Sequence, residues 1–109
     1  MPDLDQPAAE ATLSVAEDGS GGLRVAIGGE LDVGTIERLG GDLDALMARS
    51  AERAVVDLGQ LEFMDSSGVA LLLRIAHRFG EVELHHARPS VRRTLGLLGL
   101  TERLPLAPD

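Results

Sequence analysis

Apolar and polar residues alternate along the first third of the chain. Positions 13 and 15, and then 23, 25 and 27, are apolar, with polar or small residues between them, which is the period of a strand with one buried face. The acidic and glycine-rich segment 17–22 separates the two runs, and this arrangement predicts a β-hairpin. Because these glycines connect two strands rather than a strand and a helix, we do not expect the loop to cradle a phosphate.

A helical period follows over residues 35–49, where apolar side chains recur every three or four positions. Gly40 and Gly41 interrupt this segment, and a glycine in a helix interior costs about 1 kcal/mol relative to alanine. Either the helix is kinked at this point or a neighbouring backbone packs close to it. The sequence leaves both explanations open.

The second half of the chain alternates between strands and helices. Residues 54–58 are typical of a short central strand, residues 69–79 continue a helix that ends at Gly80, and residues 82–85 form another strand. The short connections predict a right-handed parallel crossover between these two strands.

Pro89 predicts the start of a last helix, because its missing N–H would have no partner in a first helical turn. Val91, Leu95 and Leu98 form the apolar face of this helix, and Gly99 is expected to end it.

The predicted order is β-β-α-β-α-β-α, with the option of a short final edge strand at residues 104–106. This order indicates the α/β class: a single domain with a mixed β-sheet covered by helices. We expect the domain to span residues 12–106, between a flexible N-terminal tail, 1–11, and a short C-terminal tail, 107–109.

Composition narrows the range of functions. The 109 residues suit one domain and contain no cysteine, so disulfides, thiolate catalysis and zinc–cysteine sites are excluded. The net charge of −8 and the absence of tryptophan and tyrosine argue against binding to nucleic acid or anionic lipid. No apolar run approaches the roughly 20 residues of a membrane span, and the acidic start does not resemble a signal peptide. We therefore expect a cytoplasmic protein that does not insert into the membrane and is a monomer when free.

The segment Asp65-Ser66-Ser67-Gly68 is the strongest candidate for a functional site. It presents a carboxylate and two hydroxyls where a helix begins, and such residues either cap the helix or handle phosphate. Asp32 stands in a comparable place before the first helix. A plain capping role for Asp65-Ser66, and likewise for Asp32, remains open at this stage.

Enzymatic interpretations of these serines find little support. A hydrolase nucleophile elbow has the pattern Gly-x-Ser-x-Gly, but Met64 and Asp65 occupy the position two before Ser66 and Ser67.

The histidines and glycines do not supply a cofactor site either. His77 lies within a helix, and strand alternation is expected to send His85 and His86 to opposite faces. The three histidines lack the spacing of metal ligands, and Gly28-Gly29 does not match a nucleotide-binding fingerprint. We therefore expect neither an enzyme, nor a metal, nor a cofactor; binding of a small ligand is the weakest alternative.

Three separated motifs resemble the STAS domain of anti-sigma factor antagonists, also called anti-anti-sigma factors. The likeness covers residues 12–106 and follows the order of the predicted elements. The motifs are Gly29-Glu30-Leu31-Asp32, the run from Val56-Asp57-Leu58 through Phe63-Met64-Asp65-Ser66-Ser67-Gly68-Val69, and Pro89-Ser90-Val91-Arg92-Arg93-Thr94-Leu95.

This resemblance implies a partner and a switch. Antagonists of the family bind an anti-sigma factor that is also a serine kinase, which releases the sigma factor. The kinase phosphorylates the first hydroxyl after the aspartate, here Ser66, and a phosphatase resets it. The partner-binding surface that the resemblance and the expected exposed helix face indicate consists of Glu30, Asp32, Thr35, Asp65, Ser66, Ser67, Gly68, Arg74 and Arg78, with Gly68 allowing close approach of the partner.

Phosphorylation would change the charge of this surface more than the fold. It adds about −1.5 to −2 charges beside Asp65 and Asp32, and two unit charges about 4 Å apart repel by about 1 kcal/mol in water and about 4 kcal/mol at an intermediate dielectric. A helix N-terminus, in contrast, stabilises an anion. We expect binding to switch off while the domain stays folded.

The main alternative lies within the same family. STAS domains also serve as accessory subunits of phospholipid-transport ATPase complexes, as parts of stress-signalling assemblies and as tails of anion transporters. In such a role the same helix surface would hold a partner without a phosphorylation cycle, and Ser66 would be only a helix cap.

Overall fold

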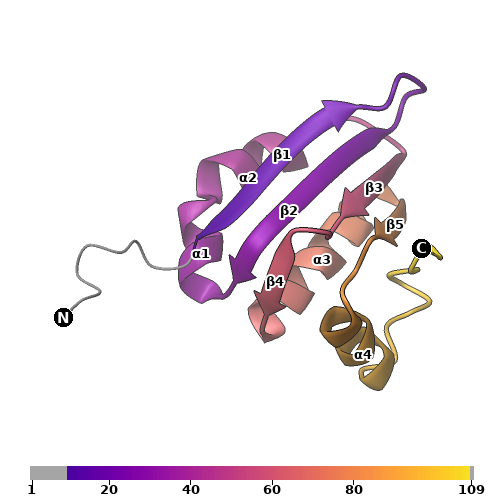
Figure 1. The fold of residues 1–109 in the computed structure, drawn as a ribbon. Helices are drawn as coiled ribbons and strands as arrows, with labels where there is room; N and C mark the ends of the chain where they lie inside the picture. Colours follow the sequence, from indigo (N-terminus) through magenta and orange to yellow (C-terminus); the bar gives the residue numbers. More distant parts are fainter. Residues whose placement is uncertain (1–9, 109) are drawn as a thin grey trace.

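The computed structural model describes residues 10–108, and Figure 1 shows the arrangement of their strands and helices. The N-terminal tail expected over residues 1–11 therefore lies largely outside the described residues; Ala11 is already the first residue of β1. The elements are β1 (Ala11–Glu17), β2 (Leu23–Leu31), α1 (Val33–Arg38), α2 (Gly40–Met47), β3 (Arg53–Asp57), β4 (Leu61–Met64), α3 (Ser66–Phe79), β5 (Glu81–His85) and α4 (Pro89–Leu97).

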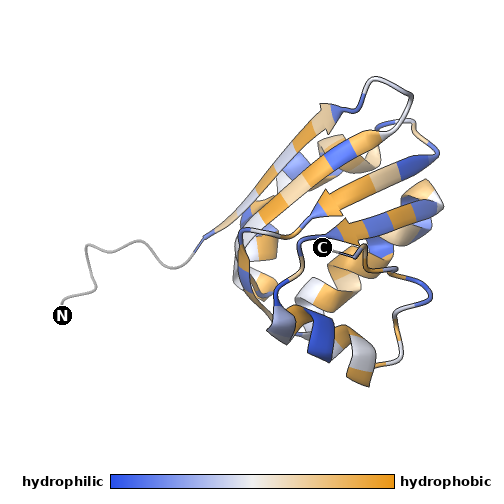
Figure 2. Ribbon diagram, turned by 45° about the vertical axis from the view of Figure 1, so that its right-hand side comes forward, coloured by the Kyte–Doolittle hydropathy of each residue, from blue (hydrophilic) through white to orange (hydrophobic). Residues whose placement is uncertain are grey.

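The sheet is mixed, as predicted. Strands β1 and β2 form the expected antiparallel hairpin, β3 pairs in parallel with β2, and β5 pairs in parallel with β3. Helices α1, α2 and α3 lie on one face of this sheet, whereas most of the other face is open (Figure 1). The alternating hydropathy that predicted the strands is visible as bands along them in Figure 2. The apolar members of this alternation point to the helices and form the core.

The core is aliphatic and lies between the sheet and α3. Leu72 and Ile75 of α3 have no exposed surface, and neither have Val25 and Val56 of the two central strands. Burying each such side chain stabilises the fold by about 1.5–3 kcal/mol. None of the helices in residues 10–108 is long and apolar enough to cross a membrane.

A fourth strand in chain order, β4, was not predicted, because residues 61–64 were interpreted as a connection. β3 pairs with the first half of β2, and β4 then pairs in parallel with its end, Gly29–Leu31, after a shift in register. Only Leu61 of the four β4 residues is buried. Such a short strand has no clear alternation in sequence, and its pairing with β2 defines it.

The predicted helix over residues 35–49 is two helices. α1 begins earlier, at Val33, and the helix is interrupted at Leu39 before α2 begins at Gly40. No atom outside the helix lies within 4 Å of the position that a Cβ would take on Gly40 or Gly41. The two glycines therefore coincide with an interruption of the helix, and not with close packing of a neighbouring backbone.

The C-terminal elements agree with the prediction except in two details. Gly99 ends the last helix region with a left-handed φ of 70°. Leu98, which was expected on the apolar face, is 56% exposed, because α4 ends before it; Leu104 instead fills the core. The expected edge strand at residues 104–106 is reduced to a single parallel bridge between Leu106 and Leu84.

Candidate functional site

Two helix N-termini lie side by side at one end of the sheet. Strands β2 and β4 run parallel and end together, and α1 and α3 begin directly after them (Figure 1). The backbone N–H of Asp65 donates to the carbonyl of Leu31 at 3.1 Å, which joins the two strand-to-helix turns. The pairing of β4 with β2 thus brings Asp32 and Asp65, which are 33 positions apart in sequence, into neighbouring turns.

Asp32 caps α1. Its carboxylate accepts the N–H of Thr35 at 2.8 Å, and its own N–H donates to the Thr35 hydroxyl at 2.9 Å, so the two residues form a capping box. The N–H of Thr35 is the main reason why the pKa of Asp32 is lowered from its ordinary value of 3.8; desolvation opposes this shift in part. Asp32 therefore carries a negative charge at neutral pH, beside the start of α3.

Thr35 supports this turn from inside rather than facing a partner. Its side chain is only 2% exposed, and its hydroxyl donates to the carbonyl of Glu30 at 2.7 Å. The sequence placed Thr35 on the binding surface, and its burial shows that the side chain is instead a positioning group. Glu30 itself is half-buried at the end of β2.

Asp65 caps α3 and leaves the next residue exposed. Its carboxylate accepts the N–H of Ser67 at 2.8 Å, and its carbonyl accepts the N–H groups of Gly68 and Val69. Ser66 is the first residue of α3 and is exposed, whereas Ser67 is half-buried. Capping by Asp65 and accessibility of Ser66 therefore coexist in one turn.

Gly68 faces the interior, contrary to the expectation that it allows a partner to approach. A Cβ at this position would lie 2.7 Å from Cβ of Met64 and 3.0 Å from Cβ of Leu31. The missing side chain lets α3 pack directly on the ends of β4 and β2. Gly68 thus positions Ser66 through the packing of its helix.

The two arginines expected in the binding surface occupy different places. Arg74 is exposed on α3, and Arg78 lies one turn further along, about 18 Å from Ser66 at 1.5 Å per residue. The guanidinium of Arg78 donates to the carbonyls of Met47, at 2.7 Å, and Arg49. These carbonyls belong to the last residue of α2 and to the segment just after it, so Arg78 joins α3 to α2 and is not brought to the site.

Two exposed apolar residues near this turn were missed by the sequence analysis. Phe63 of β4 is 50% exposed and Val33, the first residue of α1, is 60% exposed. Phe63 lies in the segment 61–64, which was treated as a connection, so its exposure could not be recognised before β4 was placed.

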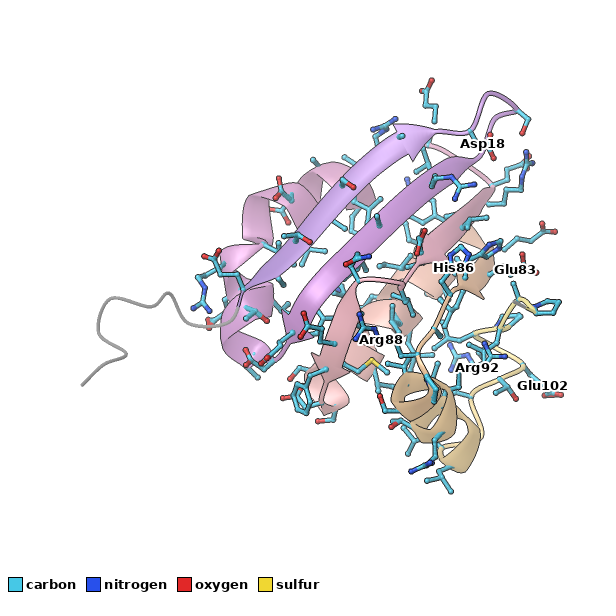
Figure 3. All side chains as sticks on the ribbon, viewed as in Figure 1. Asp18, Glu83, His86, Arg88, Arg92 and Glu102 are labelled. Atoms are coloured by element: carbon cyan, nitrogen blue, oxygen red, sulfur yellow. The ribbon has the colours of Figure 1, made fainter. Side chains whose placement is uncertain are left out.

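His85 and His86 lie together at the end of β5, whereas His77 is in the last turn of α3. His86 has a left-handed φ of 61° and follows β5, so the alternation that was expected to separate His85 and His86 does not extend to it. The centroids of their rings are 6.0 Å apart in an edge-to-face arrangement. Nδ1 of His86 lies 3.4 Å from Oδ1 of Asp57. His86 and Glu83, which lies in the middle of β5, are labelled in Figure 3. Within residues 10–108, no three metal-ligating side chains lie close enough to share an ion.

A surface hollow of about 520 Å³ lies between strands β3 and β5 and the segment that follows α4. Charges of both signs line it: Arg53 and Arg103, together with Glu81, Glu83 and Glu102. None of the residues around Ser66 contributes to this hollow.

Comparison with known proteins assigns the family. The family model described as Mlab, STAS domain, matches residues 13–107, so the chain belongs to the STAS domain family. An anti-sigma F factor antagonist of Paenibacillus polymyxa is 35% identical over 91 residues, which cover 79% of this chain and 78% of the relative.

Solved structures agree with this assignment. An anti-sigma factor antagonist from Mycobacterium paratuberculosis matches with a TM-score of 0.77 at 31% identity, over 92% of this chain and 87% of that one. The anti-sigma factor antagonist SpoIIAA in its unphosphorylated form matches with a TM-score of 0.69 at 22% identity, over 90% of both chains. Phosphorylated Bacillus SpoIIAA gives a TM-score of 0.65 at 20% identity, over 90% of this chain and 93% of that one. The last two likenesses concern the fold alone.

Proposed function

We propose that this protein is a regulatory binding protein of the cytoplasm that antagonises an anti-sigma factor. In this proposal the anti-sigma factor is also a serine kinase, and its capture by this protein releases a sigma factor. The kinase phosphorylates Ser66, which ends the interaction, and a phosphatase restores the unmodified form. The observation that carries the proposal is an exposed serine hydroxyl at the start of α3, between two capped helix N-termini, in a chain similar to anti-sigma factor antagonists.

The site suits phosphoryl transfer from another protein's nucleotide. The Ser66 oxygen would attack the γ-phosphorus of ATP, the bond to the β,γ-bridging oxygen would break and ADP would leave, while a base of the kinase takes the hydroxyl proton. No group of this chain is required as a catalyst, which fits a binding protein rather than an enzyme.

The same geometry explains why modification would end binding. A phosphate on Ser66 would stand beside the carboxylates of Asp65 and Asp32 and would face the phosphates of the nucleotide that the kinase still holds. Like charges at such distances repel, and removing a dianion from water at an interface adds a further cost. The N-terminus of α3 stabilises the phosphate within this chain, so the penalty falls on the complex.

A second candidate role is supported by the capping geometry alone. Asp65 already satisfies the N-terminus of α3, so Ser66 needs no phosphate to complete the fold. A STAS accessory subunit of a phospholipid-transport ATPase or of a stress-signalling assembly would use this surface without a phosphorylation cycle.

Capture from lysate of the native host separates the two roles. The unmodified protein and its Ser66→Asp and Ser66→Ala variants serve as baits, and mass spectrometry identifies what each retains. The proposal expects an anti-sigma kinase on the wild type and on Ser66→Ala, and its loss from Ser66→Asp. Transport-ATPase subunits held equally by all three baits would refute the switch and support the accessory role.

A further inference from the structure

Four large apolar side chains are exposed in the described part of the chain. Leu97 and Leu98, at the end of α4, are 81% and 56% exposed. Val33 and Phe63, at 60% and 50%, belong to the end of the sheet where Ser66 lies. Exposed aromatic residues near a functional turn are the type that most often anchors a protein–protein interface.

The exposure of Phe63 follows from its place on β4. Its neighbour Met64 is directed to Gly68 of α3, and successive residues of a strand face opposite sides, so Phe63 faces away from α3. In the sheet, Phe63 is paired in register with Glu30 of β2. Ser66 follows only three positions later.

Phe63 also lines a groove that leads away from Ser66. The groove has a volume of about 170 Å³ and lies between β4 and α4. Ser90 and Thr94 of α4 form its other side. The apolar surface next to Ser66 therefore continues across β4 to α4, on a different side from the one where Arg78 lies.

The charged side chains of the two turns and of β4 are acidic, and Arg38, the last residue of α1, lies near Asp32. Arginine is absent from residues 25–37 and 54–73, which contain both turns and β4. The carboxylates in the two turns and beside the anchors are Glu30, Asp32, Glu62 and Asp65. An apolar centre with an acidic rim is complementary to a partner with an apolar depression surrounded by basic side chains.

We propose that the anti-sigma kinase docks on Phe63 and Val33, and that its footprint extends from Ser66 across β4 into the groove beside Ser90. This inference rests on the proposed function and specifies how the partner is held. The ring of Phe63 enters an apolar depression of the kinase, and basic side chains of the kinase surround it. Arg78, at the far end of α3, lies outside the footprint.

The apolar anchors and the acidic rim have different effects on binding. Truncation of a central aromatic anchor commonly weakens binding by more than tenfold and acts mainly on dissociation. The acidic rim acts mainly on association and is screened by salt. The proposal therefore expects the complex to form more slowly at high salt, with Phe63 still required.

Purified anti-sigma factors of the native host, each tested singly, provide a defined panel of probes for this inference. Surface plasmon resonance compares wild type with Phe63→Ala, Val33→Ala and Ser90→Arg. Leu97→Ala and Leu98→Ala are the controls, because they shorten exposed apolar side chains that do not line the groove. We expect about tenfold or greater weakening for Phe63→Ala, a smaller loss for the other two, and less than about twofold change for both controls. Thermal denaturation of each variant verifies that it is folded.

The outcomes separate this inference from the proposed function. One outcome is that an anti-sigma factor binds the wild type, fails to bind Ser66→Asp, and binds Phe63→Ala and Ser90→Arg as tightly as the wild type. In that case the proposed docking surface is wrong, and the proposed switch at Ser66 stands. Weakening by Leu97→Ala equal to that by Phe63→Ala also overturns the inference. If no anti-sigma factor of the host binds the wild type, the proposed function itself fails.

Discussion

Gly68 shows how a single residue positions the candidate site. It lies where α3 crosses the ends of β2 and β4, and its hydrogen replaces a Cβ that would stand 2.7 Å from Met64. Any side chain at this position pushes the helix start, and with it Ser66, away from the turn formed by Asp32. The glycine therefore serves the geometry between the two turns, although it is not itself on the surface.

Gly68→Ala is expected to destabilise the domain by about 1–3 kcal/mol through overpacking. Urea denaturation of both forms measures the difference in the free energy of unfolding. Gly96→Ala is the control, because no atom outside α4 lies within 4 Å of its added Cβ, and alanine there stabilises by about 0.4–1 kcal/mol. Equal stability of Gly68→Ala and the wild type would show that the helix start adjusts freely.

Asp32, also a single residue, makes the stability of the domain depend on pH. Because hydrogen bonding from Thr35 lowers its pKa in the folded state, its stabilising effect is complete above the ordinary pKa of 3.8 and is lost as the pH falls through the folded value. Asparagine in this position caps a helix as well as aspartate does but does not titrate. The Asp32→Asn variant should therefore lose less stability than the wild type when the pH falls from about 7 to about 3. If urea denaturation shows that the wild type and Asp32→Asn lose equal stability over this pH range, the stabilising role of the Asp32 charge is contradicted.

At the scale of the elements, Arg78 fastens the end of α2 to α3. Its guanidinium donates to the carbonyls of Met47 and Arg49, which would otherwise lack helical partners. The guanidinium carbon of Arg78, Cζ, also lies 5.2 Å from the centre of the Phe79 ring. The short helix α2 thus depends on a side chain of another helix.

Arg78→Ala is expected to cost about 1 kcal/mol and to speed hydrogen exchange at the end of α2, because these carbonyls lose their charged donor. Arg74→Ala, on an exposed position of the same helix, should leave exchange in α2 unchanged. Mass-spectrometric hydrogen exchange on both variants makes the comparison. Unchanged exchange in Arg78→Ala would indicate that α2 is held by its packing on β1.

At the scale of the whole molecule, the site lies on the outside of a well-packed domain. Ser66 is exposed, whereas the residues that hold α3 in place, such as Leu72 and Ile75, have no exposed surface. A charge added at Ser66 therefore reaches a partner without passing through the core. The fold that this chain shares with SpoIIAA is found in both the unphosphorylated and the phosphorylated form of that protein.

Ser66→Asp should accordingly keep the fold. We expect an unchanged circular dichroism spectrum and a free energy of unfolding equal to or slightly above that of the wild type, since a negative charge near a helix N-terminus contributes about 0.3–1 kcal/mol. Ser66→Ala serves as the uncharged reference. An unfolded or strongly destabilised Ser66→Asp would mean that charge at this position acts on the fold rather than on binding alone.

The sequence by itself determined the elements whose periodicity is long and regular. The hairpin, α3 with its end at Gly80, and the last helix beginning at Pro89 were all predicted, because each buries one face against the same core. The turn around Ser66 was also recognised, since carboxyl and hydroxyl groups before an apolar helix have few uses other than capping and phosphate chemistry.

Only the tertiary structure decided how these parts meet. β4 exists because it pairs with the end of β2, and that pairing places Asp65 beside the turn of Asp32. The same contacts turn Thr35 and Gly68 inward, although both were expected on the binding surface, and leave Phe63 outside. Local patterns record which residues suit a helix start or a strand. Exposure depends on which other segment covers a residue, and that follows from packing between positions far apart in the chain.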